Sequence, residues 1–316
     1  MRNPTGKSAA KSATYVARVN RAIDYIVQHL DESLSLEVVA RKAGFSPFHF
    51  HRIFRSLTGE SLHEFVKRVR LERAVALLTR QDWATRRRPS LTDIALACGF
   101  ASSSDFSRSF KQRFGVPASR FDVAAFRRER RAEWERVVSD PKKGNHLQRL
   151  KPGANPDGFK VRLRALPARA VAYIRVPNAY SGDGVMDAIA RLTRWAEARG
   201  LADGQWLGYM WDDPEIVPHE KCRYDVGLEI PATGAAALPT GEIGRFEFPA
   251  MQVAEVEVRG AIELEMRALD WLFGTWLPAS GYVPTEQPCF EAWIGRPWAH
   301  GTEHFELRVQ IPVERG

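Results

Sequence analysis

The chain has 316 residues, of which 44% are hydrophobic and 27% charged, and this is the composition of a folded protein with room for two domains. No stretch approaches the roughly 20 apolar residues of a membrane-spanning helix, and the first 15 residues lack the apolar run of a signal peptide, so we expect a cytoplasmic protein without membrane contact. Cys98, Cys222 and Cys289 are too scattered for a metal motif, and we expect reduced thiols, no metal and no cofactor.

The charge is distributed unevenly along the chain. Residues 1–150 contain 29 Lys and Arg against 15 Asp and Glu, a net charge of +14, whereas the remainder contains 17 basic and 23 acidic residues, a net charge of −6. A basic half joined to an acidic half indicates a polyanionic partner for the first half alone.

The first elements in chain order are a tail and a helix. Residues 1–14 are small, polar and basic, and we expect them to be disordered. Residues 16–30 have an apolar stripe at helical spacing and predict the first helix.

A helix–turn–helix unit follows, and the chain contains it twice. Residues 35–61 and 90–119 share a Ser-Leu start, a central Gly-Phe (residues 44–45 and 99–100) and an FxRxF helix that ends at a glycine. Gly44 and Gly99 suit the left-handed conformation that ends the first helix of each unit. The spacing of the apolar residues leaves two sets of side chains on the outer face of the second helices. These sets are Phe48, His51, Arg52 and Arg55, and Ser103, Ser104, Ser107 and Arg108.

Small polar residues with an arginine, on an exposed helix after a tight turn, suit the edges of DNA bases. The alternative is a pair of helical hairpins with ordinary solvated faces, but an arginine at the same place in both copies favours DNA. An amphipathic helix over residues 61–79, about 28 Å long, separates the copies and approaches the spacing of about 34 Å between successive major grooves.

Three arginines in the joining segment, residues 82–90, suit either phosphate contacts or a solvated loop. Residues 121–137 predict a packing helix that becomes a charge run, RRERRAEWER, which we interpret as a solvated helix end.

The repeated unit resembles the DNA-binding domain of the AraC/XylS family of transcription regulators. The resemblance rests on the AxxxGF turns, the FxRxF helices, the Gly-Val-Pro at 115–117 and Arg120, and it covers about residues 17–127. It implies that the second helix of each unit reads double-stranded DNA. We place this domain at residues 15–138, ahead of the sensing part of the chain, as in the Rob-like minority of the family.

Residues 139–158 are rich in Pro, Gly, Asn and Lys and predict a linker. From residue 159 to 316 the order strand, strand, helix, strand, strand appears twice. The predicted fold class is therefore a multidomain chain: an all-α tandem helix-turn-helix domain followed by an α+β domain of two ββαββ halves, each an antiparallel sheet backed by a helix.

The second domain resembles the GyrI-like, or effector-binding, domain. The resemblance rests on LGYMWDDP (207–214), CRYDVGL (222–228), Gly-Tyr at 281–282, PCFEAW (288–293) and the strand at 305–312. It implies that a small, often cationic and aromatic molecule binds in a cleft between the halves, beside the strand glutamate Glu291. Where the family has an aromatic residue, frequently Tyr, two places later, this chain has Trp293.

The residues themselves support an organic-cation site. Glu291 lies in an otherwise apolar, aromatic strand, where a carboxylate is costly to bury without a cation or hydrogen-bond donors. Seven of the nine tryptophans follow residue 190, and aromatic faces with one carboxylate suit an organic cation. The alternative is a solvent-facing glutamate above core tryptophans. The predicted ligand-binding residues are Glu291, Trp293, Trp206, Tyr209, Trp211 and Tyr224.

These features predict a sequence-specific transcription regulator, not an enzyme, whose second domain senses a small molecule and which has RNA polymerase as a further possible partner. One alternative is a GyrI-like hydrolase fused to a DNA-binding domain, with Glu291 and Tyr209, Tyr224 or Tyr282 as a general acid–base pair. The other is a DNA-binding protein that senses nothing.

Overall fold

The computed structural model describes residues 6–78, 89–138, 150–180, 182–233, 240–299, 301 and 303–316. The chain forms two compact units, one of residues 1–128 with 240–244, and one of residues 129–239 with 245–316. Within the described residues no helix is both long and apolar enough to cross a membrane.

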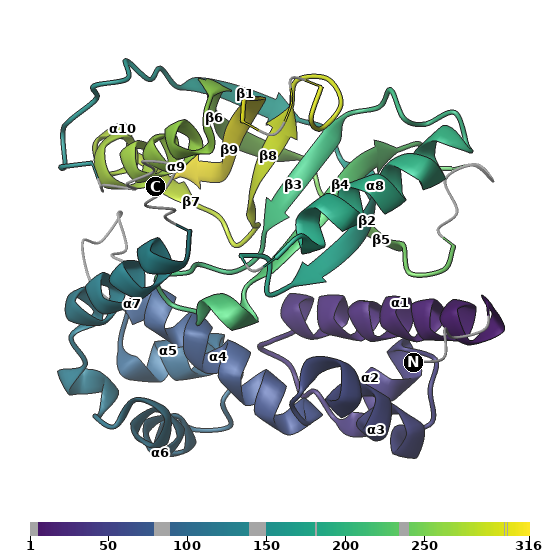
Figure 1. The fold of residues 1–316 in the computed structure, drawn as a ribbon. Helices are drawn as coiled ribbons and strands as arrows, with labels where there is room; N and C mark the ends of the chain where they lie inside the picture. Colours follow the sequence, from purple (N-terminus) through teal and green to yellow (C-terminus); the bar gives the residue numbers. More distant parts are fainter. Residues whose placement is uncertain are drawn as a thin grey trace. The chain divides into compact units, whose positions relative to one another are not determined.

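The first unit is helical and contains both predicted helix–turn–helix copies (Figure 1). Its elements are α1 (Gly6–Gln28), α2 (Leu36–Lys42), α3 (Pro47–Thr58), α4 (Leu62–Leu78), α5 (Leu91–Ala97), α6 (Ser103–Phe114), the short η1 (Ala118–Arg120) and the start of α7 (Val123–Val138). The prediction of a disordered tail is wrong for residues 6–14, because α1 already begins at Gly6. After Gly6 the sequence contains no proline or further glycine to interrupt this helix.

Serine caps and glycine stops set the helix ends of both copies. Ser46 and Ser102 accept hydrogen bonds from backbone N–H groups in the first turns of α3 and α6. Gly59 and Gly115 end the same helices with φ angles of 75° and 79°. Because the caps repeat, the two second helices begin and end at matching positions.

The second copy packs, through its turn at Gly99, against the backbone between α1 and α2. This glycine has a φ of 77°, and a Cβ there would lie 2.0 Å from the carbonyl oxygen of Leu30. Arg70 of α4 donates from Nε to that same carbonyl oxygen at 2.9 Å, and from Nη2 to the carbonyl of Glu32 at 2.7 Å. The second copy is thereby held close to the backbone that follows α1 in the first.

The second unit is an α+β structure. Its strands are β1 (Arg162–Leu166), β2 (Arg169–Pro177), β3 (Trp206–Met210), β4 (Arg223–Ile230), β5 (Gly244–Phe248), β6 (Met251–Gly260), β7 (Tyr282–Pro284), β8 (Cys289–Trp293) and β9 (Phe305–Arg315). Its helices are α8 (Gly184–Glu197), the short η3 (His219–Lys221), α9 (Ile262–Trp271), a π-helical turn η5 (Leu272–Trp276) and α10 (Leu277–Ser280). The predicted fold class, all-α followed by α+β, is confirmed.

The two halves of this unit share one sheet. Its strand order is β1-β6-β9-β8-β3-β4-β2-β5, with β7 paired to β9. The central β3–β8 pair joins the halves, while β1 pairs with β6 and β5 lies next to β2. Each half therefore gives its first strand to the other half, which corrects the expectation of a separate sheet for each half.

The sheet curls over one of its faces. Phe248 of the edge strand β5 stacks on Tyr209 of the central strand β3, with ring centroids 4.4 Å apart. In a flat sheet these two strands would be about 14 Å apart, since two others lie between them. An apolar core that includes Leu207, Phe290 and Val253 fills this face. Of the helices, α8 packs on β2 and β4, and α9 packs on β6 and β9.

The charge run of α7 is mostly part of the second unit rather than a solvated helix end. Arg131 is only 8% exposed, and its Nη1 and Nη2 donate to the two carboxylate oxygens of Asp270 at 2.9 and 3.0 Å. Its Nε donates to Glu135 at 2.6 Å. Trp134 is 2% exposed. Sequence alone suggested solvation because charged residues outnumber apolar ones there, but ion pairs allow the burial.

Candidate functional site

The predicted DNA-reading side chains lie on α3 and α6 and are all exposed. Exposure is the condition for any contact with base edges or phosphates. The exposed residues are Phe48, His51, Arg52 and Arg55 on α3, and Ser103, Ser104, Ser107 and Arg108 on α6. Among the described residues, Arg52 and Arg108 make weak local contacts: Arg52 lies 5.9 Å from the ring centre of Phe48, and Arg108 lies 3.5 Å from Asp105.

Helix α4 packs against both α3 and α6 and holds them in the same unit. Figure 1 shows α3 and α6 on the same lower edge of the helical unit, on either side of α4. One unit thus presents two similar exposed helices, each capped at its start and held by an aromatic core that includes Phe50, Phe54, Phe106 and Phe110.

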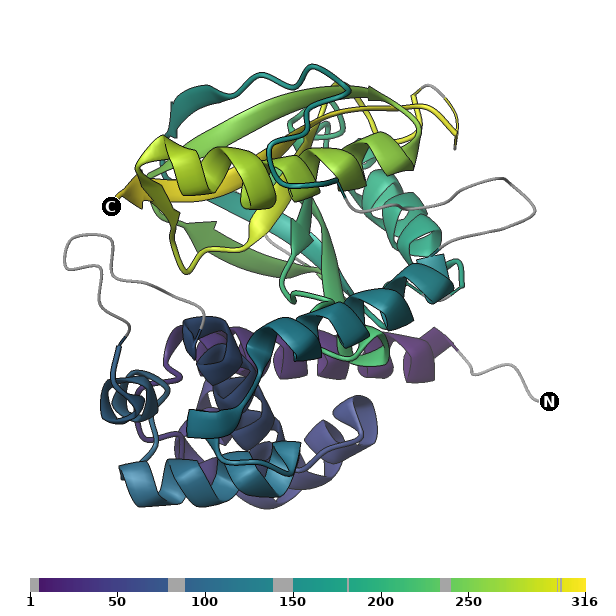
Figure 2. The same cartoon turned by 90° about the vertical axis from the view of Figure 1, so that its left-hand side faces the viewer.

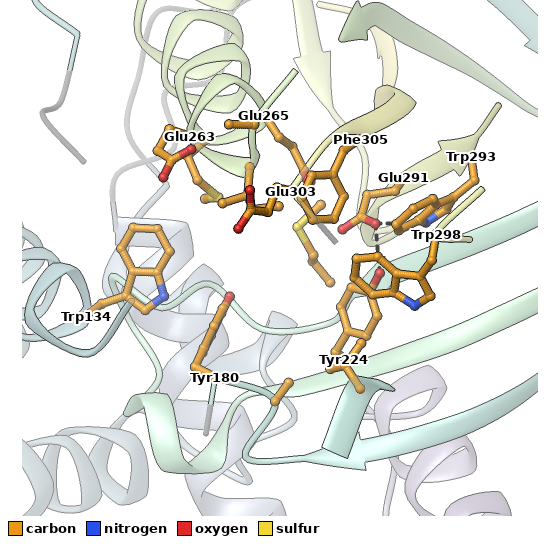
Figure 3. A pocket seen from close by; sticks show the side chains of 16 residues that line it. Trp134, Tyr180, Tyr224, Glu263, Glu265, Glu291, Trp293, Trp298, Glu303 and Phe305 are labelled. Atoms are coloured by element: carbon orange, nitrogen blue, oxygen red, sulfur yellow. Dashed lines mark hydrogen bonds between the residues drawn. The ribbon is translucent and has the colours of Figure 1, made fainter. Parts of the chain in front are cut away.

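A cavity of about 690 Å³ lies in the second unit. Its walls come from α8, α9, the strands β3, β4 and β8, the loop before β9, and Trp134 of α7 (Figure 3). Four glutamates line it, together with several aromatic rings; the glutamates are Glu263, Glu265, Glu291 and Glu303. This size is typical of small-molecule sites.

Glu291 is the buried carboxylate of this cavity, 7% exposed on β8. Its Oε2 accepts a hydrogen bond from the Tyr224 hydroxyl at 2.8 Å and another from the Trp293 indole N–H at 3.1 Å. Burial raises the pKa of Glu291, and the hydrogen bonds from Tyr224, Glu265 and Trp293 act against that rise. Two donors on one oxygen favour the ionised form.

The missing side chain of Gly208 makes room for this arrangement. Gly208 on β3 lies opposite Glu291 in the β3–β8 register. A Cβ at residue 208 would lie 1.8 Å from the Tyr224 hydroxyl oxygen and 2.8 Å from Oε2 of Glu291. The Tyr224–Glu291 hydrogen bond therefore crosses over β3, and only glycine permits this path.

Glu265 of α9 forms a carboxyl pair with Glu291. Glu265 is 2% exposed, and its pKa is raised well above the ordinary value by burial, by the charge of Glu291 and by a hydrogen bond to it. A hydrogen bond between two carboxyl groups requires one proton, which the pair shares, and the stronger rise in the pKa of Glu265 favours that side chain as its carrier.

Aromatic rings surround these carboxyl groups. Trp298 lies 5.5 Å from Trp293 and 5.3 Å from Phe305 between ring centroids, and Trp134 lies 5.8 Å from Tyr180. Trp298 has a φ of 61°, a left-handed conformation that is costly for a bulky side chain. Such backbone is retained where the position of the side chain matters more than its conformational cost.

Comparison with known proteins gives a match for each unit. Residues 159–314 match the GyrI-like small molecule binding domain, and residues 39–123 match a helix-turn-helix domain. The regulatory protein SoxS of Salmonella typhimurium is 35% identical over 96 residues, which are 30% of this chain and 84% of SoxS. The helix-turn-helix transcriptional regulator YbfP of Bacillus subtilis is 35% identical over 235 residues, which are 70% of this chain and 75% of YbfP. This alignment is longer than either matched domain.

The chain belongs to the AraC-type helix-turn-helix transcription regulators. A DNA gyrase inhibitor of Edwardsiella piscicida is 32% identical over 161 residues, 48% of this chain and 98% of that protein. The predicted architecture is confirmed: an AraC-type DNA-binding domain first and a GyrI-like small-molecule-binding domain second. This AraC-type regulator therefore binds DNA and carries a domain that binds a small molecule.

In this regulator three of the six predicted ligand-binding residues line the cavity, namely Glu291, Trp293 and Tyr224. Trp293 replaces the aromatic residue that is frequently Tyr in GyrI-like domains, and its indole N–H donates to Glu291.

The other three predicted residues lie elsewhere, which corrects that part of the prediction. Tyr209 belongs to the core on the opposite face of the sheet, because neighbouring residues of a strand alternate between faces. Trp211 packs on the same core and donates its indole N–H to Asp225 at 2.6 Å. Trp206 is 1% exposed and donates to the carbonyl of Ala202 at 2.8 Å.

The sequence interpretation missed Glu265 and Trp134. Glu265 lies in a helix whose first turn is acidic, and nothing in that pattern separates a buried glutamate from a solvated one. Trp134 lies in the charge run of α7, outside the segment that resembles GyrI-like domains. A tryptophan among charged residues was the only available signal. Within the described part of the chain, no group of three or more His, Cys, Asp or Glu residues is placed to hold a metal ion.

Proposed function

We propose that the exposed faces of α3 and α6 read operator DNA, that the cavity around Glu291 binds an aromatic organic cation, and that binding of this cation changes the affinity of the chain for DNA or its contact with RNA polymerase. The observation that carries the ligand class is the buried Glu291 carboxylate, which accepts two hydrogen bonds among aromatic rings. Coupling between two sites of this kind is typically worth about 1–3 kcal/mol.

The proposal that the chain reads DNA is supported by two similar exposed helix faces, one on α3 and one on α6. Arg52 and Arg108 occupy equivalent positions in the FxRxF helices and are exposed. An arginine can bind guanine through two hydrogen bonds in the major groove, and such a contact discriminates between bases. The basic half of the chain supplies the general attraction to phosphate.

The first test replaces Arg52 or Arg108 by Ala in the full chain. We expect each change to weaken binding to a site selected from random DNA by about 1–3 kcal/mol, with little effect on random DNA. Fluorescence anisotropy at fixed salt measures both affinities. Arg21→Ala is the matched control, because Arg21 is exposed on α1 and its removal lowers the charge of the same unit equally. Equal losses on selected and random DNA would reduce Arg52 and Arg108 to phosphate contacts.

The second test concerns the charge of the cavity. We expect Glu291→Gln to weaken binding of tetraphenylphosphonium, a permanent aromatic cation, by about tenfold or more, and to leave the affinity for neutral triphenylphosphine oxide within about twofold. Glutamine keeps an acceptor oxygen for Tyr224 and Trp293, so the variant removes mainly the charge. Calorimetry measures both affinities, and the anisotropy assay with and without the cation measures the coupling.

The results of these binding assays distinguish a ligand-sensing regulator from a DNA-binding protein that senses nothing. Unchanged binding of both compounds by Glu291→Gln would place the site elsewhere. Binding without any change in DNA affinity would leave contact with RNA polymerase as the output, which transcription in vitro measures. No binding of any aromatic cation would favour a DNA-binding protein that senses nothing.

The Tyr224–Glu291 hydrogen bond supports one second candidate, a small-molecule hydrolase. A carboxylate next to a phenol is a suitable general acid–base pair. Burial and the neighbouring Glu291 raise the pKa of Tyr224 well above its ordinary value, which keeps it a proton donor at neutral pH. Recovery of a bound ligand unchanged after long incubation would exclude this candidate for that ligand. The other predicted partners of Glu291, Tyr209 and Tyr282, are not among the residues that line the cavity.

A further inference from the structure

The cavity has two ends, and each combines a carboxylate with aromatic rings. At one end Tyr224, Trp293 and Trp298 surround Glu291, and at the other Trp134 and Tyr180 lie on the side of Glu263 (Figure 3). The second end is built from different elements, since Glu263 lies in the first turn of α9, Trp134 belongs to α7 and Tyr180 follows β2. A single positive charge held at Glu291 would leave this second end unused.

The second end offers a buried acceptor that no described residue satisfies. Oε1 of Glu263 is buried and has no hydrogen-bond partner in the described part of the chain. Arg267 is near enough for the charge of Glu263 to raise its pKa. Its Nε and Nη2, however, donate to Asp157, both at 2.8 Å. Glu263 itself is half-buried and lines the cavity, and a carboxylate that lacks donors in such a place is stabilised by a ligand that supplies one.

The middle of the cavity adds a third carboxyl group. Glu265 is almost fully buried and lines the cavity next to Glu291. Glu265 follows Glu263 by two residues in the first turn of α9, and both line the cavity, so the carboxyl groups of α9 extend from the second end towards Glu291. Cations that carry N–H groups, such as amidinium or ammonium, can donate to these oxygens, whereas a quaternary ammonium cannot.

We propose that the cavity binds an organic dication with two separate N–H-bearing aromatic heads, one paired with Glu291 and the other with Glu263, beside Trp134 and Tyr180. The inference rests on the proposed function and specifies its ligand class. A volume of about 690 Å³ accommodates two rings and a short linker. The heads gain charge-assisted hydrogen bonds at both ends and contact with the aromatic faces.

The experiment uses the full chain and two matched probes. The first consists of two para-amidinophenoxy groups joined by a five-carbon chain. The second is identical except that one amidine is replaced by a neutral carboxamide. Calorimetry measures both affinities in the unmodified chain and in Glu263→Gln, Glu291→Gln and Glu314→Gln. Glu314 is an exposed glutamate outside the cavity lining and controls for a change in overall charge.

We expect the dication to bind the unmodified chain and Glu314→Gln on the order of tenfold or more tighter than the monocation. Glu263→Gln should remove most of this preference and leave the affinity for the monocation unchanged, since its single charge lies at Glu291. Glu291→Gln should weaken both probes. Thermal melting of each variant checks that it is folded, and Glu263→Asp, which keeps the charge, should retain part of the preference.

Two results would overturn the inference while leaving the proposed function intact. They are equal affinities of the unmodified chain for both probes, and a dication preference that survives in Glu263→Gln. Binding of neither probe nor of tetraphenylphosphonium would instead overturn the proposed function itself.

Discussion

The buried carboxyl pair of Glu265 and Glu291 makes the second unit sensitive to pH. Two carboxyl groups in a buried cavity cannot both ionise without strong repulsion, so folding favours the form that keeps one proton. A carboxyl group whose pKa is raised by folding contributes stability below its unfolded pKa, near 4.3, and that contribution is lost as the pH rises through the folded pKa. The cavity thus lowers the stability of the fold at neutral and higher pH.

Glu265→Gln should therefore raise the melting temperature of the second unit at pH values of about 7 to 8 and change it little near pH 4. The amide cannot ionise, so the variant lacks the cost of holding a second charge next to Glu291. Scanning calorimetry across this pH range measures the difference. Glu303→Gln, which removes an exposed carboxylate from the same lining, serves as the control and should show no such pH dependence. Equal melting shifts at all pH values would contradict the shared proton.

At this scale the sequence predicted the site in part. Glu291 was recognisable because a charged residue among Cys, Phe, Ala and Trp is unusual in a strand. Tyr209 and Tyr224 are both strand tyrosines, and the face to which each points depends on a register that the sequence does not reveal. Whether Glu263 and Glu265 reach the cavity depends on how α9 packs on the sheet, and this packing cannot be read from the sequence.

Each unit is built from a duplicated set of helices or strands, and backbone contacts determine how these elements are arranged. In the helical unit the contact is at Gly99, where the second turn meets the carbonyl of Leu30. In the α+β unit it is the exchange of β1 and β5 between halves. The repeats were visible in the sequence, but the exchange was not, because a ββαββ order is compatible with either pairing.

Gly99→Ala should destabilise the helical unit by at least about 2 kcal/mol, because the Cβ combines a left-handed φ with a clash against backbone. Gly59→Ala is the matched control. Gly59 has nearly the same φ, 75°, but a Cβ there meets nothing within 4 Å, so only the conformational cost of about 1 kcal/mol remains. Urea unfolding followed by far-UV circular dichroism compares the two variants. Equal losses would mean that the turn at Gly99 can move away from Leu30.

For the whole molecule, charge and composition already separated a basic DNA-binding half from an acidic ligand-binding half. The exact division could not be predicted, because polar composition made residues 139–158 the natural boundary. Their described part, residues 150–158, is attached to the second unit, where the backbone N–H of Gly153 donates to Thr275 and Arg267 pairs with Asp157. Before that segment, α7 belongs to both units, since Phe126 lies in the first and Trp134 in the second.

This shared helix bears on how the protein can be divided for study. A fragment starting at residue 159, where the similarity to GyrI-like domains begins, would keep Glu291 and the sheet but lose the tryptophan that closes one end of the cavity. A fragment starting at Glu129 would retain that wall and the ion pairs of Arg131. A screen for effectors with the fragment that starts at residue 159 would therefore test a wider and less selective cavity than that of the intact chain.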